Sequence, residues 1–501
     1  MSISARLKPS IRPLVYSGLI AIVSALCFAQ YGFEGGLTRD TANLIYSGQQ
    51  MARGVPHYVS AFNHSGPLSP MIAGVSISAA RLFNADDVIA VRVLFFICAV
   101  LTVAGVYLLA LTLFESQAVG FLSAFAFLGF ECFGEDAASG PRAKIPMVLF
   151  QALALALAAR RSWFWSGLFG SLAFLVWQPM AVFPLLTIFL ALAQAPPGRD
   201  RRRNLILAAS GFVLPIAMVC IYFLSMRAFN EMFEGVLLFN LFYLEREPSS
   251  FLQHMAALVG AILRSYSIMT VPIFLAFLAL GFIYFWRVRL EGGIRQTISN
   301  DRFAVILLSL PAPLLWSMMD FQGCPDFYVF LPYLAIGFGW LLSLMSKALA
   351  GFEAIGPKSH KLVPVTLCLL LVTASALEYR RNANRELRDQ RTAARALESE
   401  FGSGIRIISI SAPELLVLMN RTNPNRYIFI ASGVDNLIDA RTPGGFDGWL
   451  QQLEDYNPDV IAFGPATGRF SLRLVEWLKS RYSERSLLEW KLYVREPQTQ
   501  R

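Results

Sequence analysis

The feature that most constrains the fold of this chain is a series of long apolar runs. Counted as stretches of about 17–25 mostly apolar residues, these runs predict about eleven membrane spans between residues 14 and 377. Of the 501 residues, 55% are hydrophobic and only 15% are charged, which excludes an ordinary soluble globular protein. The 40 phenylalanines and 9 tryptophans are typical of a polytopic α-helical membrane protein with aromatic residues at the lipid interface.

Basic clusters between the apolar runs predict the orientation of the chain. Under this count, the clusters at residues 160–161, 199–203, 287–302 and 347–361 all fall on one side of the membrane. The positive-inside rule makes that side cytoplasmic, so we expect the N-terminus inside and, after an odd number of spans, the C-terminus outside. These clusters account for the net charge of +9, and without a basic soluble face we expect no nucleic-acid partner.

The composition changes at about residue 378, where the apolar runs end. A charged helix is expected over residues 378–400, followed by strands over 405–410, 427–431, 460–463 and 487–494 and helices over 445–454 and 471–481. Alternating strands and helices predict a small α/β domain. We therefore expect a transmembrane domain over residues 1–377 and a soluble extracytoplasmic domain over residues 378–501.

A polar stretch over residues 33–70, in the first outer loop, interrupts the apolar pattern. A membrane protein tolerates charged, irregular backbone at its edge where that backbone lines a cavity or a site. We interpret Asp40 as the residue that faces a reaction, with Arg39 beside it as a substrate contact. Tyr58 is a candidate to stack on a sugar or to anchor at the interface. His64 is a candidate to bind a sugar or phosphate, and bracing of the loop is its structural alternative.

Two later outer loops bring more ionisable residues to the same face. The second loop carries Asp136, Arg142 and Lys144, and the loop before the tenth span carries Gln322, Asp326 and Tyr328. Each of these residues alone could be an interface anchor. Because carboxylates and cations converge on one side of the membrane, we interpret the set as functional.

Two segments resemble loops of the GT-C glycosyltransferases, multi-spanning enzymes that use lipid-linked sugars. They are TRDTANLIYSGQQMARGVPHYVSAFNHSGPLSPMIAG, after the first span, and DFQGCPDFYVFLPYLAIG, in the later loop. The superfamily includes protein O-mannosyltransferases, lipid A aminoarabinose transferases and mycobacterial arabinosyltransferases. The resemblance implies a catalytic acid just after the first span, at Asp40. Many members place a second acid next to it, whereas this chain has Thr41, so Asp40 acts either alone or with Asp136.

The resemblance implies transfer of a sugar from a polyprenyl-phosphate donor to a glycan, glycolipid or protein acceptor, with inversion. A carboxylate suits the general base that deprotonates the acceptor hydroxyl. Fixed cations stabilise the departing phosphate, a role that fits Arg142 and Lys144; binding of lipid headgroups is the alternative. Gln322, Asp326 and Tyr328 are then expected to line the sugar pocket. The expected location is a bacterial inner membrane, with the active site on the extracytoplasmic side.

Several alternatives stay open. A transporter or flippase for a lipid-linked saccharide is the rival function, but transporters tend to show paired repeats and charges at mid-membrane, and neither is visible here. The four histidines are too dispersed for a metal site, and dependence on a divalent metal is left undecided. For the six cysteines we expect core packing, with a disulfide between Cys132 and Cys324 as the less favoured alternative.

Overall fold

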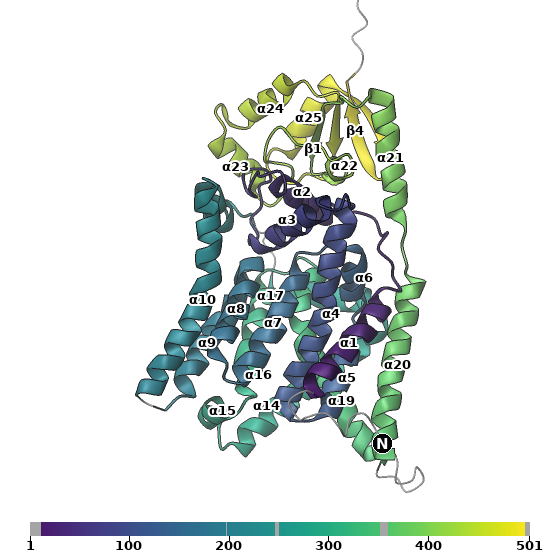
Figure 1. Ribbon diagram of the computed structural model, residues 1–501. Coiled ribbons are helices and arrows are strands. Elements are labelled where there is room, and N and C mark those ends of the chain that lie inside the picture. Colours follow the sequence, from purple (N-terminus) through teal and green to yellow (C-terminus); the bar gives the residue numbers. More distant parts are fainter. Residues whose placement is uncertain (1–11, 197, 246–249, 351–358, 496–501) are drawn as a thin grey trace, which may run out of the picture. The chain divides into compact units, whose positions relative to one another are not determined.

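The computed structural model describes residues 12–196, 198–245, 250–350 and 359–495, which group into two compact units (Figure 1). Unit 1 contains Met1–Gly32, Val93–Met218 and Ser249–Ala383, and unit 2 contains Phe33–Arg92, Val219–Pro248 and Asn384–Arg501. Part of the predicted basic cluster at residues 347–361 lies outside the described residues.

Unit 1 is built from helices, and most of its apolar runs form one helix each. Its described elements are α1 (Arg12–Phe28), α4 (Asp87–Phe114), α5 (Gln117–Leu128), α6 (Glu131–Ser139), α7 (Lys144–Ala159), α8 (Trp163–Val176), η2 (Gln178–Ala181), α9 (Val182–Ala193), α10 (Arg199–Ser225), α13 (Phe251–Ser265), η4 (Ser267–Met269), α14 (Thr270–Leu290), α15 (Ile294–Asn300), α16 (Ala304–Ser309), α17 (Pro311–Met319), α18 (Cys324–Phe327), η5 (Tyr328–Phe330), α19 (Leu331–Ala350) and α20 (Ser359–Arg381). The first residues of α4 and the last residues of α10 belong to unit 2.

Among the described residues, five helices are long and apolar enough to cross a membrane, or up to seven if each of two bent helix pairs forms one span. Four shorter apolar helices accompany them. The count of about eleven spans stays a prediction. Burial separates these helices into two kinds: 83% of the apolar window in Cys324–Leu349 is buried, compared with 22% in α10. We interpret the first as the centre of the helical unit and α10 as lipid-facing.

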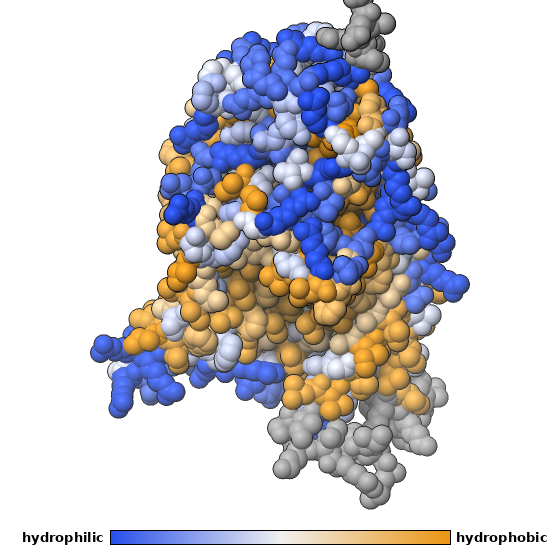
Figure 2. Space-filling view, turned by 45° about the horizontal axis from the view of Figure 1, so that its top comes forward, coloured by the Kyte–Doolittle hydropathy of each residue, from blue (hydrophilic) through white to orange (hydrophobic). Residues whose placement is uncertain are grey.

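The surface of the peripheral helices agrees with that interpretation. Apolar side chains form a broad area in the space-filling view (Figure 2). On α10, Met218 and Ile221 are more than half exposed, as are Val271 and Leu278 on α14. A soluble protein rarely exposes so many large apolar side chains on one surface, whereas contact with lipid tails accounts for them.

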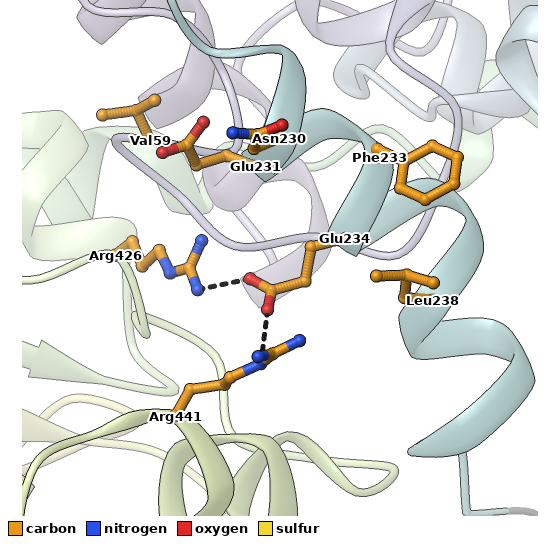
Figure 3. A pocket seen from close by; sticks show the side chains of 8 residues that line it. All are labelled: Val59, Asn230, Glu231, Phe233, Glu234, Leu238, Arg426 and Arg441. Carbon is orange, nitrogen blue, oxygen red and sulfur yellow. Dashed lines mark hydrogen bonds and ion pairs between the residues drawn. The ribbon is translucent and has the colours of Figure 1, made fainter.

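Unit 2 combines a small sheet with helices from three separate parts of the chain. Its helices are α2 (Arg39–Met51), α3 (Leu68–Arg81), α11 (Phe229–Phe233), the π-helix η3 (Glu234–Leu238), α12 (Phe239–Phe242), α21 (Glu386–Phe401), α22 (Glu414–Leu418), α23 (Val434–Arg441), α24 (Gly445–Tyr456) and α25 (Ser471–Arg481). Its strands are β1 (Ile407–Ile410), β2 (Val460–Phe463), β3 (Ser483–Leu487) and β4 (Trp490–Val494). An ion-pair cluster joins η3 to the C-terminal part of this unit (Figure 3).

The sheet has the strand order β1-β2-β4-β3, in which β1 and β2 are parallel and the other pairs are antiparallel. Its register pairs Ile407 with Val460 and Ile461 with Tyr493. Apolar side chains of the sheet and of α23, α24 and α25 form the core of the unit. Phe62 and Phe239 join this core from outside the C-terminal sequence, which explains why the first polar stretch belongs to unit 2.

Three details of the predicted C-terminal domain are wrong. Residues 427–431 form no strand, although the Ser411 N–H donates a hydrogen bond to Ile428 O. Ser411 has a left-handed backbone conformation (φ 59°), and no ladder of further strand hydrogen bonds follows it. The predicted strand over residues 487–494 begins too early: β4 covers Trp490–Val494, and a turn at Leu488 joins it to β3, which is not predicted from the sequence. The predicted charged helix is broken after α20, and Asn384 accepts a hydrogen bond from the Glu386 N–H at the start of α21.

The polar first loop folds mainly as two helices, α2 and α3. Thr38 and Thr41 form a capping box, so α2 begins at Arg39. The far end of α2 contacts α22, and the Tyr46 hydroxyl accepts a hydrogen bond from the Asn423 N–H at 3.0 Å. These contacts hold the first loop within unit 2.

Arg92 lies in the apolar helix α4 and holds the beginning of this loop by hydrogen bonds. It is fully buried, and its guanidinium donates hydrogen bonds to Phe33 O at 2.5 Å and Gly35 O at 2.7 Å. A buried arginine is tolerated only where its donors are satisfied. Arg92 therefore fixes the backbone just before Asp40.

Candidate functional site

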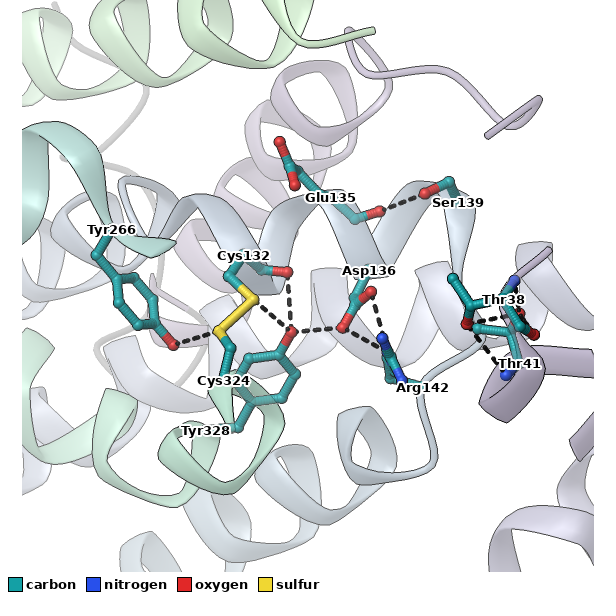
Figure 4. A network of polar contacts seen from close by, with 10 residues as sticks. All are labelled: Thr38, Thr41, Cys132, Glu135, Asp136, Ser139, Arg142, Tyr266, Cys324 and Tyr328. Atoms are coloured by element: carbon teal, nitrogen blue, oxygen red, sulfur yellow. Dashed lines mark hydrogen bonds and ion pairs between the residues drawn. A yellow bond between two sulfur atoms is a disulfide. The ribbon is translucent and has the colours of Figure 1, made fainter. Parts of the chain in front are cut away.

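A carboxylate of α6 and an arginine of the following loop form the first part of the site. Asp136 lies in the last turns of α6, and Arg142 Nε lies 3.2 Å from its Oδ2 (Figure 4). The chain returns so sharply that a Cβ atom at Gly140 would collide with Asp136 O. This close approach requires glycine, and the tight turn brings Arg142 back to the carboxylate six residues before it.

Tyr328 contacts the same carboxylate from a distant part of the sequence. Its hydroxyl lies 2.5 Å from Asp136 Oδ2 and 2.8 Å from Cys132 O, and the side chain is fully buried. A disulfide joins Cys132 to Cys324, so the expectation of core packing is wrong for these two cysteines. The bond connects the start of α6 to the start of α18, which positions Tyr328 beside Asp136.

The second part of the site is built on Lys144, the first residue of α7. Its ammonium forms an ion pair with Asp326 and lies 3.7 Å from the centre of the Trp177 ring. The Gln322 N–H donates a hydrogen bond to the other oxygen of Asp326 at 2.7 Å. Only 17% of the Lys144 side chain and 10% of the Asp326 side chain are exposed, so water screens this pair weakly.

The two parts follow one pattern. Each cation, Arg142 or Lys144, is held by one carboxylate, and each carboxylate accepts a further hydrogen bond from a residue near α18. Cations fixed in this way can bind a phosphate without first being ordered, which lowers the entropic cost of binding. Trp177 is not among the residues predicted from the sequence, because a tryptophan next to a span is typical of an interface anchor.

Asp40 and Arg39 lie in unit 2, at the start of α2. Arg39 donates a hydrogen bond to Pro465 O at 2.9 Å and lies over the Phe429 ring. Asp40 is exposed.

Glu414, on α22, is buried, and burial raises its pKa to about 7. The charges of Glu489 and Asp40 add to this rise in pKa, and the charge of Arg39 opposes it.

The other two predicted residues of the first loop are packed differently. Tyr58 is fully buried, its ring contacts those of His57 and Phe223, and its hydroxyl donates to Ser65 O at 2.7 Å. The partly exposed His64 ring stacks on Phe239. The structure thus gathers six of the predicted residues in unit 1 and leaves Arg39, Asp40, Tyr58 and His64 in unit 2. The contribution of each to a reaction stays a prediction.

Within the described ranges, no group of three or more His, Cys, Asp or Glu side chains could hold a metal ion.

Comparisons with known proteins connect this architecture to sugar transfer. Residues 66–223 match the family model of the dolichyl-phosphate-mannose-protein mannosyltransferases. No curated protein matches the sequence. The crystal structure of ArnT from Cupriavidus metallidurans in the apo state is similar at a TM-score of 0.63 and 12% identity, over 98% of this chain and 100% of that chain. The same protein bound to undecaprenyl phosphate matches at a TM-score of 0.63 and 12% identity, over 97% and 100% of the two chains. The predicted helical membrane fold with a small C-terminal sheet is thereby confirmed.

Proposed function

We propose that this chain, a membrane glycosyltransferase of the GT-C superfamily, transfers a sugar from a polyprenyl-phosphate donor to an acceptor of the cell envelope. The family-model match and the shared fold confirm the membership that the two outer loops predict. One observation carries the proposed reaction: Arg142 and Lys144 are both preorganised by carboxylates in one part of unit 1.

Arg142 and Lys144 are the proposed binding groups for the donor phosphate. As the bond between sugar and phosphate breaks, negative charge develops on the leaving oxygen, and fixed cations stabilise it. The structurally similar protein that binds undecaprenyl phosphate supports a lipid phosphate as the ligand. Asp136 and Asp326 hold the cations in place, while Gln322 and Tyr328 help to shape the donor pocket.

Asp40 is the proposed general base. Asp136 is already engaged with Arg142 and Tyr328, which favours an orienting role for it over proton transfer. Deprotonation of an acceptor hydroxyl by Asp40 would allow a single displacement, which inverts the anomeric centre. Arg39, Tyr58 and His64 are proposed to act near the sugar, either directly or by supporting the loop that carries Asp40.

The proposed reaction takes place at the extracytoplasmic face of a bacterial inner membrane. The orientation predicted from the basic clusters supports this placement, which also puts the domain over residues 378–501 on the same side. That domain would then guide the acceptor. The acceptor is a glycan, a glycolipid or a protein.

The test uses the full chain in lipid nanodiscs and an undecaprenyl-phosphate sugar with a radioactive label in the sugar. Asp40→Asn is expected to lower transfer to envelope acceptors by at least about 100-fold, the contribution typical of a general base. The exposed Asp447, which pairs with Arg473, provides the control Asp447→Asn, for which unchanged transfer is expected. Unchanged transfer by Asp40→Asn would remove that residue from the mechanism. Movement of the intact donor across the bilayer without transfer would instead favour the flippase.

A further inference from the structure

A cavity of about 540 Å³ lies within unit 2, separate from the residues used so far. Its lining comes from the first loop, from the segment over residues 230–238 and from the C-terminal part of the chain (Figure 3). The lining side chains are Val59, Asn230, Glu231, Phe233, Glu234, Leu238, Arg426 and Arg441. A cavity of this size falls within the range that small ligands occupy.

Two arginines of the cavity share one carboxylate. Arg426 lies 2.6 Å from one oxygen of Glu234, and Arg441 lies 2.9 Å from the other. The Arg426 side chain is 19% exposed and also donates to the Tyr427 hydroxyl, so this guanidinium is largely satisfied. The Arg441 side chain is 48% exposed, which leaves donors of its guanidinium accessible from the cavity.

A second carboxylate of the cavity lacks a hydrogen-bond donor. Glu231 Oε2 is buried and accepts no hydrogen bond within the described part of the chain. A buried acceptor without a partner costs about 1–3 kcal/mol, so a ligand that supplies a donor there is favoured. Both arginines of the lining already pair with Glu234, and the Glu231 carboxylate repels an anion placed beside it, which disfavours a strongly anionic ligand.

The backbone of this segment is unusual at the same place. The five residues Glu234–Leu238 form a π-helix, a rare conformation found frequently at functional sites. The wide turn is held by Asn240, whose amide donates to Val236 O at 2.9 Å and to His64 O at 3.0 Å. Glu234 and Leu238, the first and last residues of the π-helix, both line the cavity.

We propose that this cavity binds a neutral saccharide unit of the acceptor. A sugar hydroxyl donates to Glu231, other hydroxyl oxygens accept from Arg441, and the apolar face of the ring packs against Phe233 and Leu238. The inference rests on the proposed function, because it names the acceptor class of that transfer. A phosphate or carboxylate would meet the negative charge of Glu231, whereas a neutral sugar satisfies both kinds of polar group.

The test measures binding of the purified full chain, in nanodiscs, to an array of neutral, phosphorylated and carboxylated glycans. Wild-type protein is expected to bind neutral glycans. Glu231→Ala is expected to weaken this binding at least tenfold. Val59→Trp fills the cavity from a loop position and is expected to weaken it equally, even if Glu231→Ala fails to fold. Arg473→Ala removes an exposed guanidinium elsewhere in unit 2 and serves as the control with unchanged binding.

Three results would overturn the inference: no glycan binding, binding only to phosphorylated or carboxylated glycans, or neutral-glycan binding that both cavity variants leave unchanged. Cleavage of the labelled donor is measured on the same wild-type preparation. Donor cleavage without glycan binding overturns the cavity alone. Glycan binding without donor cleavage overturns the proposed function, and with it the acceptor role of the sugar, but leaves the saccharide site itself standing.

Discussion

The charged groups of unit 1 and those of the unit 2 cavity each comprise two cations and two carboxylates, but the charges are paired differently. In unit 1, Arg142 and Lys144 each have a carboxylate partner. In unit 2, two arginines share Glu234, and Glu231 has an oxygen without a donor. Cations held singly by carboxylates suit a phosphate, which can replace or join the carboxylate. A mixed set with an unsatisfied acceptor suits hydroxyl groups. The number of partners for each charge is thus the basis on which two different ligands are proposed.

The largest expected effect concerns Lys144. Lys144→Ala is expected to lower donor cleavage by about 100- to 1000-fold, since removal of one stabilising group from a developing oxyanion costs about 3–4 kcal/mol. The measurement is release of labelled sugar from the undecaprenyl-phosphate donor. Arg302→Gln removes an exposed cation of unit 1 and is the control with unchanged cleavage.

Lys144→Ala also leaves Asp326 buried without its cation, so a loss of stability could imitate a loss of chemistry. The double variant Lys144→Ala/Asp326→Asn removes both charges and is expected to recover thermal stability without recovering cleavage. Recovery of cleavage by the double variant would show that Lys144 serves the fold and not the donor.

Glu414 is a buried carboxylate of unit 2, and its titration is expected to make the stability of the protein depend on pH. Burial raises its pKa to about 7 in the folded state, above the usual value of 4.5, so the folded protein binds this proton more tightly than the unfolded chain. Stability is therefore lost as the pH rises from about 4.5 to 7, by about 3 kcal/mol in the free energy of unfolding. Glu414→Gln stays neutral and is expected to be the more stable protein at pH 8.

The measurement for Glu414 is the melting temperature of wild type and variant between pH 4.5 and 8. The control is Glu454→Gln, a change at a partly exposed glutamate that pairs with Arg481. A constant difference between wild type and Glu414→Gln over that range would show that the carboxyl does not titrate there.

A smaller effect is expected for the hydroxyl of Tyr328. Tyr328→Phe removes the hydrogen bond to Asp136 but keeps the ring, so the carboxylate and Arg142 are held less firmly. A charge-assisted hydrogen bond of this kind contributes about 1.5 kcal/mol, which corresponds to roughly tenfold in donor cleavage. The matched control is Tyr333→Phe, which also removes a buried hydroxyl, here from Ser309. An equal loss in both variants would indicate a general effect on packing.

The residues of unit 1 could be named from the sequence because charge stands out beside apolar runs. Asp136, Arg142, Lys144 and Asp326 all sit where a predicted span ends or begins. The predicted topology places these loops on the same face of the membrane, so their charged residues are expected to lie near one another. The disulfide that links two of these loops was not favoured, because the spacing of two cysteines says nothing about their distance in the fold.

The cavity of unit 2 could not be predicted in this way. Glu234 lies in a segment that reads as an interfacial helix, and Arg426 and Arg441 lie in the C-terminal domain. No periodicity connects positions so far apart in the chain. Arg92 illustrates the same limit, since its buried hydrogen bonds depend on a backbone path about sixty residues earlier.

The smallest expected effect separates the two arginines that share Glu234. Arg441→Ala is expected to lower the free energy of unfolding by only about 0.5 kcal/mol, because its side chain is half exposed and water screens the pair. Arg426→Ala removes the more buried partner and is expected to cost several times more. Thermal unfolding of both variants checks the ratio. Equal losses would mean that exposure does not distinguish the two guanidiniums, and Arg441 would then be a structural residue with no donors to offer a ligand.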